Sequence, residues 1–228
     1  MAKTNGKVVT EEALSSLSAP LLPPDSQPWT GTLRLRLVIM CVLWFSANIC
    51  YYGIHFSTAR LHGDIRVNFS LLMMAEVAAN LFAHLLALPY FGRRWTLIVC
   101  LVLCSAVLML NSLVGSSFTI VRICLTIIGK FSATVNFNSI YFYTCELFPT
   151  HLRSSAIGLC STLGRVGAMV AVACSGLDWV SPALPPAIMA APAVMAALLL
   201  LRIPQPETKN CALPDTVEED GTLNHCQS

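Results

Sequence analysis

The sequence has few charged residues, and this shortage indicates the solvent for which the fold is built. Only 11% of its 228 residues are charged, whereas a soluble domain usually has about 25%. Hydrophobic residues make up 55% of the chain, and the mean hydropathy is +0.67. We therefore expect most of the chain to lie in a lipid bilayer rather than in water.

The sequence lacks the usual signals of several functional classes. The net charge is only +2, and no basic run carries interleaved aromatic residues, so nucleic acid is not an expected partner. The ten cysteines include no CxxC pair and no cysteine–histidine group with zinc spacing, so the sequence indicates neither a metal site nor a cofactor. Because no Ser–His, Cys–His or Glu–His group recurs at a useful spacing, an enzyme is not expected either.

The chain instead contains six apolar stretches, each close to the roughly 20 residues that cross a hydrocarbon core of about 30 Å. They predict an all-α membrane protein with one transmembrane helix for each stretch. A polar segment (1–32) precedes this bundle (33–203), and a polar tail (204–228) follows it. The expected helices cover residues 35–56, 69–90, 95–113, 118–145, 155–177 and 183–203.

Lysine and arginine residues in the short loops predict the orientation, because cytoplasmic loops are enriched in both. Six spans place the two termini on the same side of the membrane. Arg60 and Arg66 lie on the opposite side. The terminal side carries Lys3, Lys7, Arg34, Arg36, Arg93, Arg94, Arg153, Arg202 and Lys209. Both termini are therefore expected in the cytoplasm.

Two basic residues lie deep inside apolar stretches, where a charge costs about 2.5–3.5 kcal/mol. Lys130 lies well inside the fourth stretch, and Arg165 is near the middle of the fifth. Glu76, on the same predicted helix face as Asn80 and His84, is the carboxylate expected to pair with one of them. The other cation is then left over. This surplus favours a solute with a carboxylate or another anionic group, or an acid from outside this chain.

The fourth stretch is polar on two sides when its residues are placed about 100° apart around a helix. One side, an arc of about 80°, consists of Lys130, Thr134, Asn138, Tyr141 and Cys145, and the other consists of Ser132, Asn136, Ser139 and Tyr143. Neither side can face lipid. We expect one to pack on neighbouring helices and the other to line a wet cavity. Hydrogen bonding of these groups inside the bundle is an alternative.

Two expected cytoplasmic loops carry charged motifs. Gly92-Arg93-Arg94 joins the second and third spans, and the segment from Glu146 to Arg153 joins the fourth and fifth. Glu146 and Arg153 can form an ion pair across their loop, and such a pair can act as a latch that is made in one state and broken in another. The alternative role of Arg93 and Arg94 is to set the topology.

The run GKFSATVNFNSIYFYTCELFPTHLR, followed by GLCSTLGRVG, resembles the organic ion transporters of solute carrier family 22, in the major facilitator superfamily. The opening AKTNGKVVTEEAL is similar to the loop before the family's seventh helix, and PETKNCALPDTVEE is similar to the exit from its twelfth. The resemblance implies the C-terminal six-helix half of a twelve-helix transporter. The expected partner is then a missing N-terminal half or a full-length transporter.

The resemblance also implies roles for particular residues. The position of Arg165 resembles the arginine of the family's anion and carnitine branches, whereas the cation branch carries an aspartate there. Two positions depart from the family: Asn80 stands where the anion branch has a lysine, and Pro89 stands where the family has a loop acid. The expected substrate-binding residues are Arg165, Lys130, Asn138, Tyr141, Glu76 and Asn80, and the expected gating residues are Arg93, Arg94, Glu146 and Arg153.

Two functions follow from these observations. The first is transport of small organic anions or zwitterions across the plasma membrane, by alternating access around a site near the bilayer midplane. The second is a receptor, a scaffold or a regulator of a full-length relative that does not itself transport. The absent first half, Asn80 and Pro89 favour the second function.

Overall fold

The computed structural model describes residues 3–4, 7–8, 31–58, 63–114, 118–181 and 183–202. Apart from a few positions, the predicted polar segment 1–32 lies outside the described residues, as does the whole predicted tail 204–228. The chain divides into two units, Met1–Thr30 and Gly31–Ser228. In the first, strand β1 (Lys3–Thr4) pairs in an antiparallel manner with β2 (Lys7–Val8).

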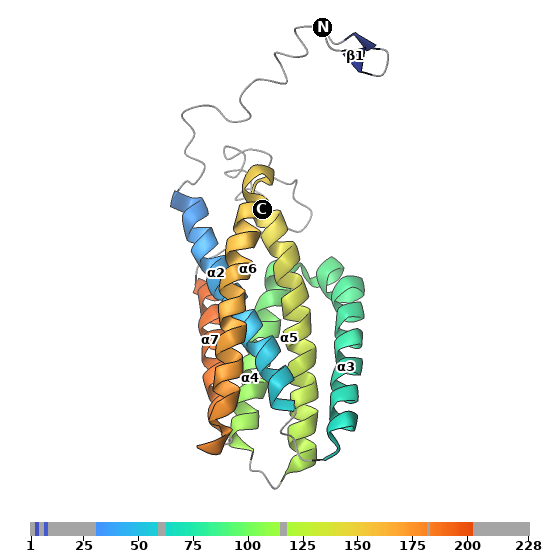
Figure 1. Ribbon diagram of the computed structural model, residues 1–228, viewed down its shortest axis with the longest axis vertical. Helices are drawn as coiled ribbons and strands as arrows, with labels where there is room; N and C mark the ends of the chain where they lie inside the picture. The colour runs from blue at the N-terminus through green and yellow to red at the C-terminus, as the bar shows by residue number, and fades with distance from the viewer. Residues whose placement is uncertain are drawn as a thin grey trace. The chain divides into compact units, whose positions relative to one another are not determined.

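The second unit is a bundle of long helices (Figure 1). Among the described residues, six helices are long and apolar enough to cross a membrane. This confirms the prediction of an all-α protein with six membrane-spanning helices. They are α2 (Gly31–Ser57), α3 (Ile65–Phe82) with its π-helical continuation η2 (Ala83–Phe91), α4 (Arg93–Leu113), α5 (Thr119–Leu147), α6 (Thr150–Ser175) and α7 (Leu184–Arg202). A short 3-10 helix, η3 (Gly176–Trp179), follows α6.

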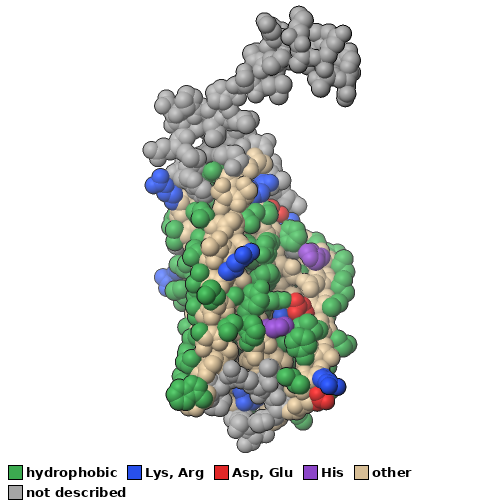
Figure 2. Space-filling view, in the orientation of Figure 1, with side chains coloured by type: hydrophobic (Ala, Val, Ile, Leu, Met, Phe, Trp, Pro, Cys, Tyr) green, Lys and Arg blue, Asp and Glu red, His purple; other side chains and the backbone are tan. Residues whose placement is uncertain are grey.

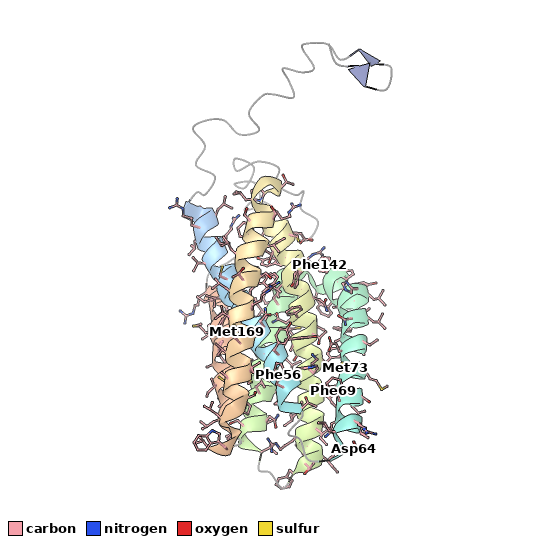
Figure 3. All side chains as sticks on the ribbon, viewed as in Figure 1. Phe56, Asp64, Phe69, Met73, Phe142 and Met169 are labelled. Atoms are coloured by element: carbon pink, nitrogen blue, oxygen red, sulfur yellow. The ribbon has the colours of Figure 1, made fainter. Side chains whose placement is uncertain are left out.

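Helix α3 begins earlier than its apolar stretch because a polar residue caps it. The Asp64 side chain, at the end of α3 in Figure 3, accepts a hydrogen bond of 2.8 Å from the backbone N–H of Arg66. A carboxylate at this position satisfies one of the free N–H groups of the first turn. The helix therefore includes residues 65–68, which the hydropathy pattern assigns to a loop.

The connection between α5 and α6 is also shorter than the sequence indicates. Only Phe148 and Pro149 separate the two helices. The Pro149 carbonyl accepts the backbone N–H of Arg153 at 2.9 Å, so a new helix starts immediately after the proline. Glu146 and Arg153 consequently lie in the last turn of α5 and the first turn of α6, rather than in a loop.

Helix α3 changes from α to π geometry before it ends. Pro89 lies inside the π-helical segment η2. A proline ring collides with the carbonyl four residues earlier in an α-helix, and the wider π turn moves that carbonyl away. The segment ends at Gly92, whose φ of 80° suits a residue without a side chain. The chain then reverses direction into α4.

Helix α2 is the central element, since it contacts α5, α6 and α7, whereas α3 contacts mainly α5. Figure 1 shows α3 at one edge of the bundle beside α5. Buried polar groups of α2 find partners on other helices: Trp44 Nε1 donates to Thr144 Oγ1 (3.0 Å), and Ser46 Oγ donates to the Pro192 carbonyl (2.8 Å). These bonds are typical of helix association in lipid.

Glycines on α6 let it approach α2 very closely. A Cβ atom built on Gly167 would lie 2.6 Å from the backbone carbonyl oxygen of Phe45, and one on Gly164 would lie 2.5 Å from Asn48 Nδ2. Real side chains do not tolerate such distances. Small residues at this seam therefore permit a backbone separation that larger residues would prevent.

Candidate functional site

The buried cation Lys130 is neutralised inside the chain. Its side chain on α5 has no exposed surface, and Nζ lies 3.0 Å from Glu76 Oε2 on α3. The hydroxyl of Tyr51 on α2 donates to the other carboxylate oxygen, Oε1. Nζ also lies 3.5 Å from the centroid of the Tyr51 ring, in the position of a cation–π contact. The ion pair that the sequence offered as one explanation of Lys130 is thus present.

Two predicted polar residues form the next contact between α3 and α5. Asn138 Nδ2 donates to Asn80 Oδ1 at 2.5 Å and to the carbonyl of Thr134 at 3.1 Å. Both asparagines are half-buried. They extend the line of polar contacts by one to two turns beyond the Glu76–Lys130 pair, so α3 is attached to the bundle by charge and by amide hydrogen bonds.

A row of aromatic rings connects this pair to the surface. Tyr51 stacks on Phe137 with centroids 4.9 Å apart, Phe137 meets Tyr141 at 5.4 Å, and Tyr141 meets Trp44 at 4.4 Å. Tyr141 is 38% exposed. A Cβ built on Gly164, the residue before Arg165, would lie 3.4 Å from Trp44 Cε3, so α6 meets the end of this row next to Arg165. The predicted residues Lys130 and Tyr141 are linked through rings rather than by direct contact.

Arg165 differs from Lys130 because its side chain is exposed. No carboxylate among the described residues pairs with it. The large apolar residues around it on α6 are also exposed, Leu163 by 44% and Val166 by 45%. Figure 2 shows one face of the molecule, where basic, acidic and histidine side chains occur at mid-height among hydrophobic ones. An exposed arginine at this depth cannot face hydrocarbon cheaply, so a polar environment must cover it.

The two polar sides of α5 have different surroundings. The second side, made of Ser132, Asn136, Ser139 and Tyr143, is buried throughout. The first side is buried at Lys130 and reaches the surface at Tyr141. The exposure of the side chains thus identifies the second side as the packed one and the first side as the open one.

The four residues expected to form a gate all lie near helix ends. Arg93, the first residue of α4, binds Glu146 Oε1 through Nη2 at 2.9 Å and through Nε at 3.0 Å. Arg153 Nη2 donates to the Phe148 carbonyl at 3.5 Å. Arg94 Nη2 donates to the Leu200 carbonyl (3.1 Å) in the last turn of α7, where a cation also interacts favourably with the helix dipole.

Sequence reasoning missed the contribution of α2 to the site. Tyr51 holds Glu76, and His55, one turn further along, meets Phe69 of α3 edge-on with centroids 5.4 Å apart. Phe69 lies on the α3 side of this contact in Figure 3. The signal was visible: Tyr51, Tyr52 and His55 are polar aromatic residues in the last two turns of an apolar stretch.

Comparison with known proteins identifies relatives. No protein-family model matches the chain. The chain is 34% identical to human organic cation/carnitine transporter 2 over 190 residues, which cover 83% of the chain and 34% of that protein. It is 32% identical to solute carrier family 22 member 6-A of Xenopus laevis over 190 residues (83% and 34%). It is also 32% identical to solute carrier family 22 member 7 of Sus scrofa over 228 residues (96% and 41%).

The chain spans about one third of the length of most of these curated relatives. All three relatives bear the names of transporters or solute carriers, and six helices of this chain are apolar enough to span a membrane. The chain is therefore an integral multi-pass membrane protein and a relative of the solute carrier family 22 transporters.

Proposed function

We propose that the chain forms one wall of a secondary transporter for small organic ions, and that Arg165 binds the anionic group of an anion or zwitterion. One observation carries this proposal. Of the two deep cations, Lys130 is already neutralised by Glu76, whereas Arg165 is exposed at mid-helix with no carboxylate partner among the described residues. The names of the relatives, which include an organic cation/carnitine transporter, support the general class of solute.

The surroundings of Arg165 fit a small organic ion. A guanidinium binds a carboxylate in a two-point geometry that an ammonium does not offer. Tyr141 and Trp44 lie at the same end of the aromatic row, with centroids 4.4 Å apart. Ring faces attract quaternary or primary ammonium groups, so the positive end of a zwitterion would be accommodated beside the rings while its carboxylate meets Arg165.

The other predicted binding residues then have supporting roles. Glu76 and Lys130 neutralise each other, and Asn80 bonds to Asn138, so these four shape the wall rather than supply its free charge. The row from Tyr51 to Tyr141 connects them to the solute. In this proposal Lys130, which the sequence predicts as a ligand, pairs with Glu76, and Arg165 binds the anion.

Transport by alternating access requires a second wall. Major facilitator proteins place the solute between two six-helix halves that rock around it. A second six-helix unit, whether an N-terminal half or a full-length transporter, would cover Arg165 and Tyr141 with polar groups. In this arrangement the protein lies in the plasma membrane with both termini in the cytoplasm, and the Arg93–Glu146 pair is part of the cytoplasmic gate.

Uptake into vesicles tests the proposal. The full chain is reconstituted alone and together with a full-length relative, and uptake of labelled anionic, zwitterionic and cationic solutes is measured. We expect Arg165→Ala to reduce uptake of the anionic or zwitterionic solute by at least about tenfold, because a charged partner of a carboxylate contributes on the order of 1.5–3 kcal/mol. Arg165→Lys should retain part of the uptake.

The matched control is Arg66→Ala, which removes an exposed arginine in the first turn of α3 and should leave uptake unchanged. Equal uptake by the Arg165→Ala variant and the unmodified chain would contradict the proposed binding role. If the chain co-purifies with a full-length relative and changes that relative's uptake without any uptake of its own, it acts as a regulator instead.

A further inference from the structure

Two thiols from different helices face each other at the seam between α2 and α6. Cys41 Sγ lies 3.7 Å from Cys160 Sγ, and the two residues are 119 positions apart in the sequence. Cys160 is fully buried, and Cys41 is half-buried. A reagent can therefore reach the sulfur of Cys41, whereas the sulfur of Cys160 is buried.

The helices that carry the two thiols are tightly packed next to the sulfur pair. Trp44 and Asn48 follow Cys41 on the same face of α2, and Gly164 follows Cys160 by one turn on α6. A Cβ on Gly164 would lie 2.5 Å from Asn48 Nδ2 and 3.4 Å from Trp44 Cε3. Close packing one turn beyond the thiols therefore holds α2 and α6 in position next to the sulfur pair.

We propose that Cys41 and Cys160 form an oxidisable dithiol whose disulfide ties α2 to α6. Hydrogen peroxide converts one thiolate into a sulfenic acid and releases hydroxide. The neighbouring thiol then attacks that sulfur, so that the S–S bond forms and water leaves. In sum, two thiols and one hydrogen peroxide give one disulfide and two waters. The sulfurs move from 3.7 Å to about 2.05 Å.

A second cysteine of α2 provides a contrast within the same helix. Cys50 is 1% exposed, and its thiol donates to the carbonyl of Met189 at 3.5 Å. Oxidation of a thiol requires access for the oxidant and formation of the thiolate. Cys104 lies beside Cys50, so both cysteines have a thiol neighbour. Cys50 has no access for the oxidant, however, whereas Cys41 has partial access. Oxidation should therefore select the Cys41–Cys160 pair.

The position of the disulfide gives it a consequence for the candidate site. Cys160 precedes Arg165 by five residues, or about 7.5 Å along α6. A covalent link there would hold the arginine-bearing helix against α2, which carries Trp44 and Tyr51.

Peptide mapping of the full chain in membranes tests the proposal. Membranes are treated with hydrogen peroxide or left untreated, free thiols are blocked with an alkylating reagent, and the protein is digested with trypsin. The peptide 37–60 contains Cys41 and Cys50, and the peptide 154–165 contains Cys160. We expect the two peptides linked, with the loss of two hydrogen atoms, at an abundance at least about tenfold above that in the untreated sample. Dithiothreitol should separate them.

Serine variants identify the sulfurs, because serine nearly preserves the size of cysteine. Cys50→Ser should keep the linked peptide, while Cys41→Ser and Cys160→Ser should each abolish it. A linked peptide that survives Cys41→Ser but not Cys50→Ser would overturn the proposal, as would the absence of any linked peptide at an oxidant dose that modifies the exposed thiol of Cys124. If one serine variant fails to accumulate, the other, together with Cys50→Ser, decides the result.

Discussion

At the scale of single residues, the carboxylate of Glu76 determines how a lysine can remain charged inside the bundle. Lys130 has no exposed surface, and Glu76 keeps 23% of its side chain exposed. A buried cation without a counter-charge would be very costly. Tyr51 supplies a further hydrogen bond to the carboxylate, so both of its oxygens are engaged.

Replacement of this carboxylate should therefore destabilise the bundle strongly. We expect Glu76→Gln to lower the free energy of unfolding by about 3 kcal/mol, because it leaves the Lys130 ammonium buried without a counter-charge. The measurement is the temperature at which the protein in detergent loses its folded fraction. The double variant Glu76→Gln with Lys130→Met should recover much of the loss. A double variant as unstable as the sum of the single variants would show that the two charges do not interact.

At the scale of elements, the helix seams depend on where the glycines lie. Gly167 and Gly158 both belong to α6, but their surroundings are opposite. A Cβ on Gly167 would meet the Phe45 carbonyl at 2.6 Å, whereas a Cβ on Gly158 would meet nothing within 4 Å. One helix thus contains both a site that requires glycine and a site that does not.

This contrast gives a matched pair of variants. Gly167→Ala should destabilise the bundle by about 1–3 kcal/mol, because the added methyl group forces α6 away from α2. Gly158→Ala should be neutral or slightly stabilising, since alanine favours a helix more than glycine does. Thermal unfolding of both variants in the same detergent measures the difference. Equal stabilities of the two variants would mean that α2 and α6 do not approach as closely as described.

The elements also show which features could be predicted from the sequence. The six spans followed from hydropathy, because an apolar stretch of about 20 residues has few other uses. The Glu76–Lys130 pair could be predicted because few charges lie in the membrane region. The row of rings from Tyr51 to Tyr141 could not be predicted, since contacts between rings on α2 and α5 depend on how the helices rotate against each other. The π turn at Pro89 likewise depends on the backbone and has no distinct sequence signal.

At the scale of the whole molecule, the six membrane-spanning helices among the described residues predict that both ends of the chain lie on one side of the membrane. The lysine and arginine distribution predicts the cytoplasmic side. The charged contacts of Arg93, Glu146 and Arg94 occur where α4 begins and where α5 and α7 end. These helix ends lie on the side of the membrane that is predicted to be cytoplasmic.

Epitope accessibility in intact cells measures this orientation. A tag inserted between Val114 and Phe118, in the connection from α4 to α5, should bind antibody without permeabilisation. A tag at either terminus should bind antibody only after permeabilisation. The insertion site joins two spans on the side opposite to the termini, so a single labelling experiment compares both faces. Terminal tags that are labelled in intact cells would reverse the predicted orientation.

The position of Glu76 has a mechanical consequence for α3. This helix lies at the edge of the bundle and packs mainly on α5, and Glu76 joins it to Tyr51 of α2 and Lys130 of α5 at the same point. One carboxylate thus connects three helices. A rotation of α5 against α2 must therefore either break one of the two contacts of Glu76 or move α3 with it.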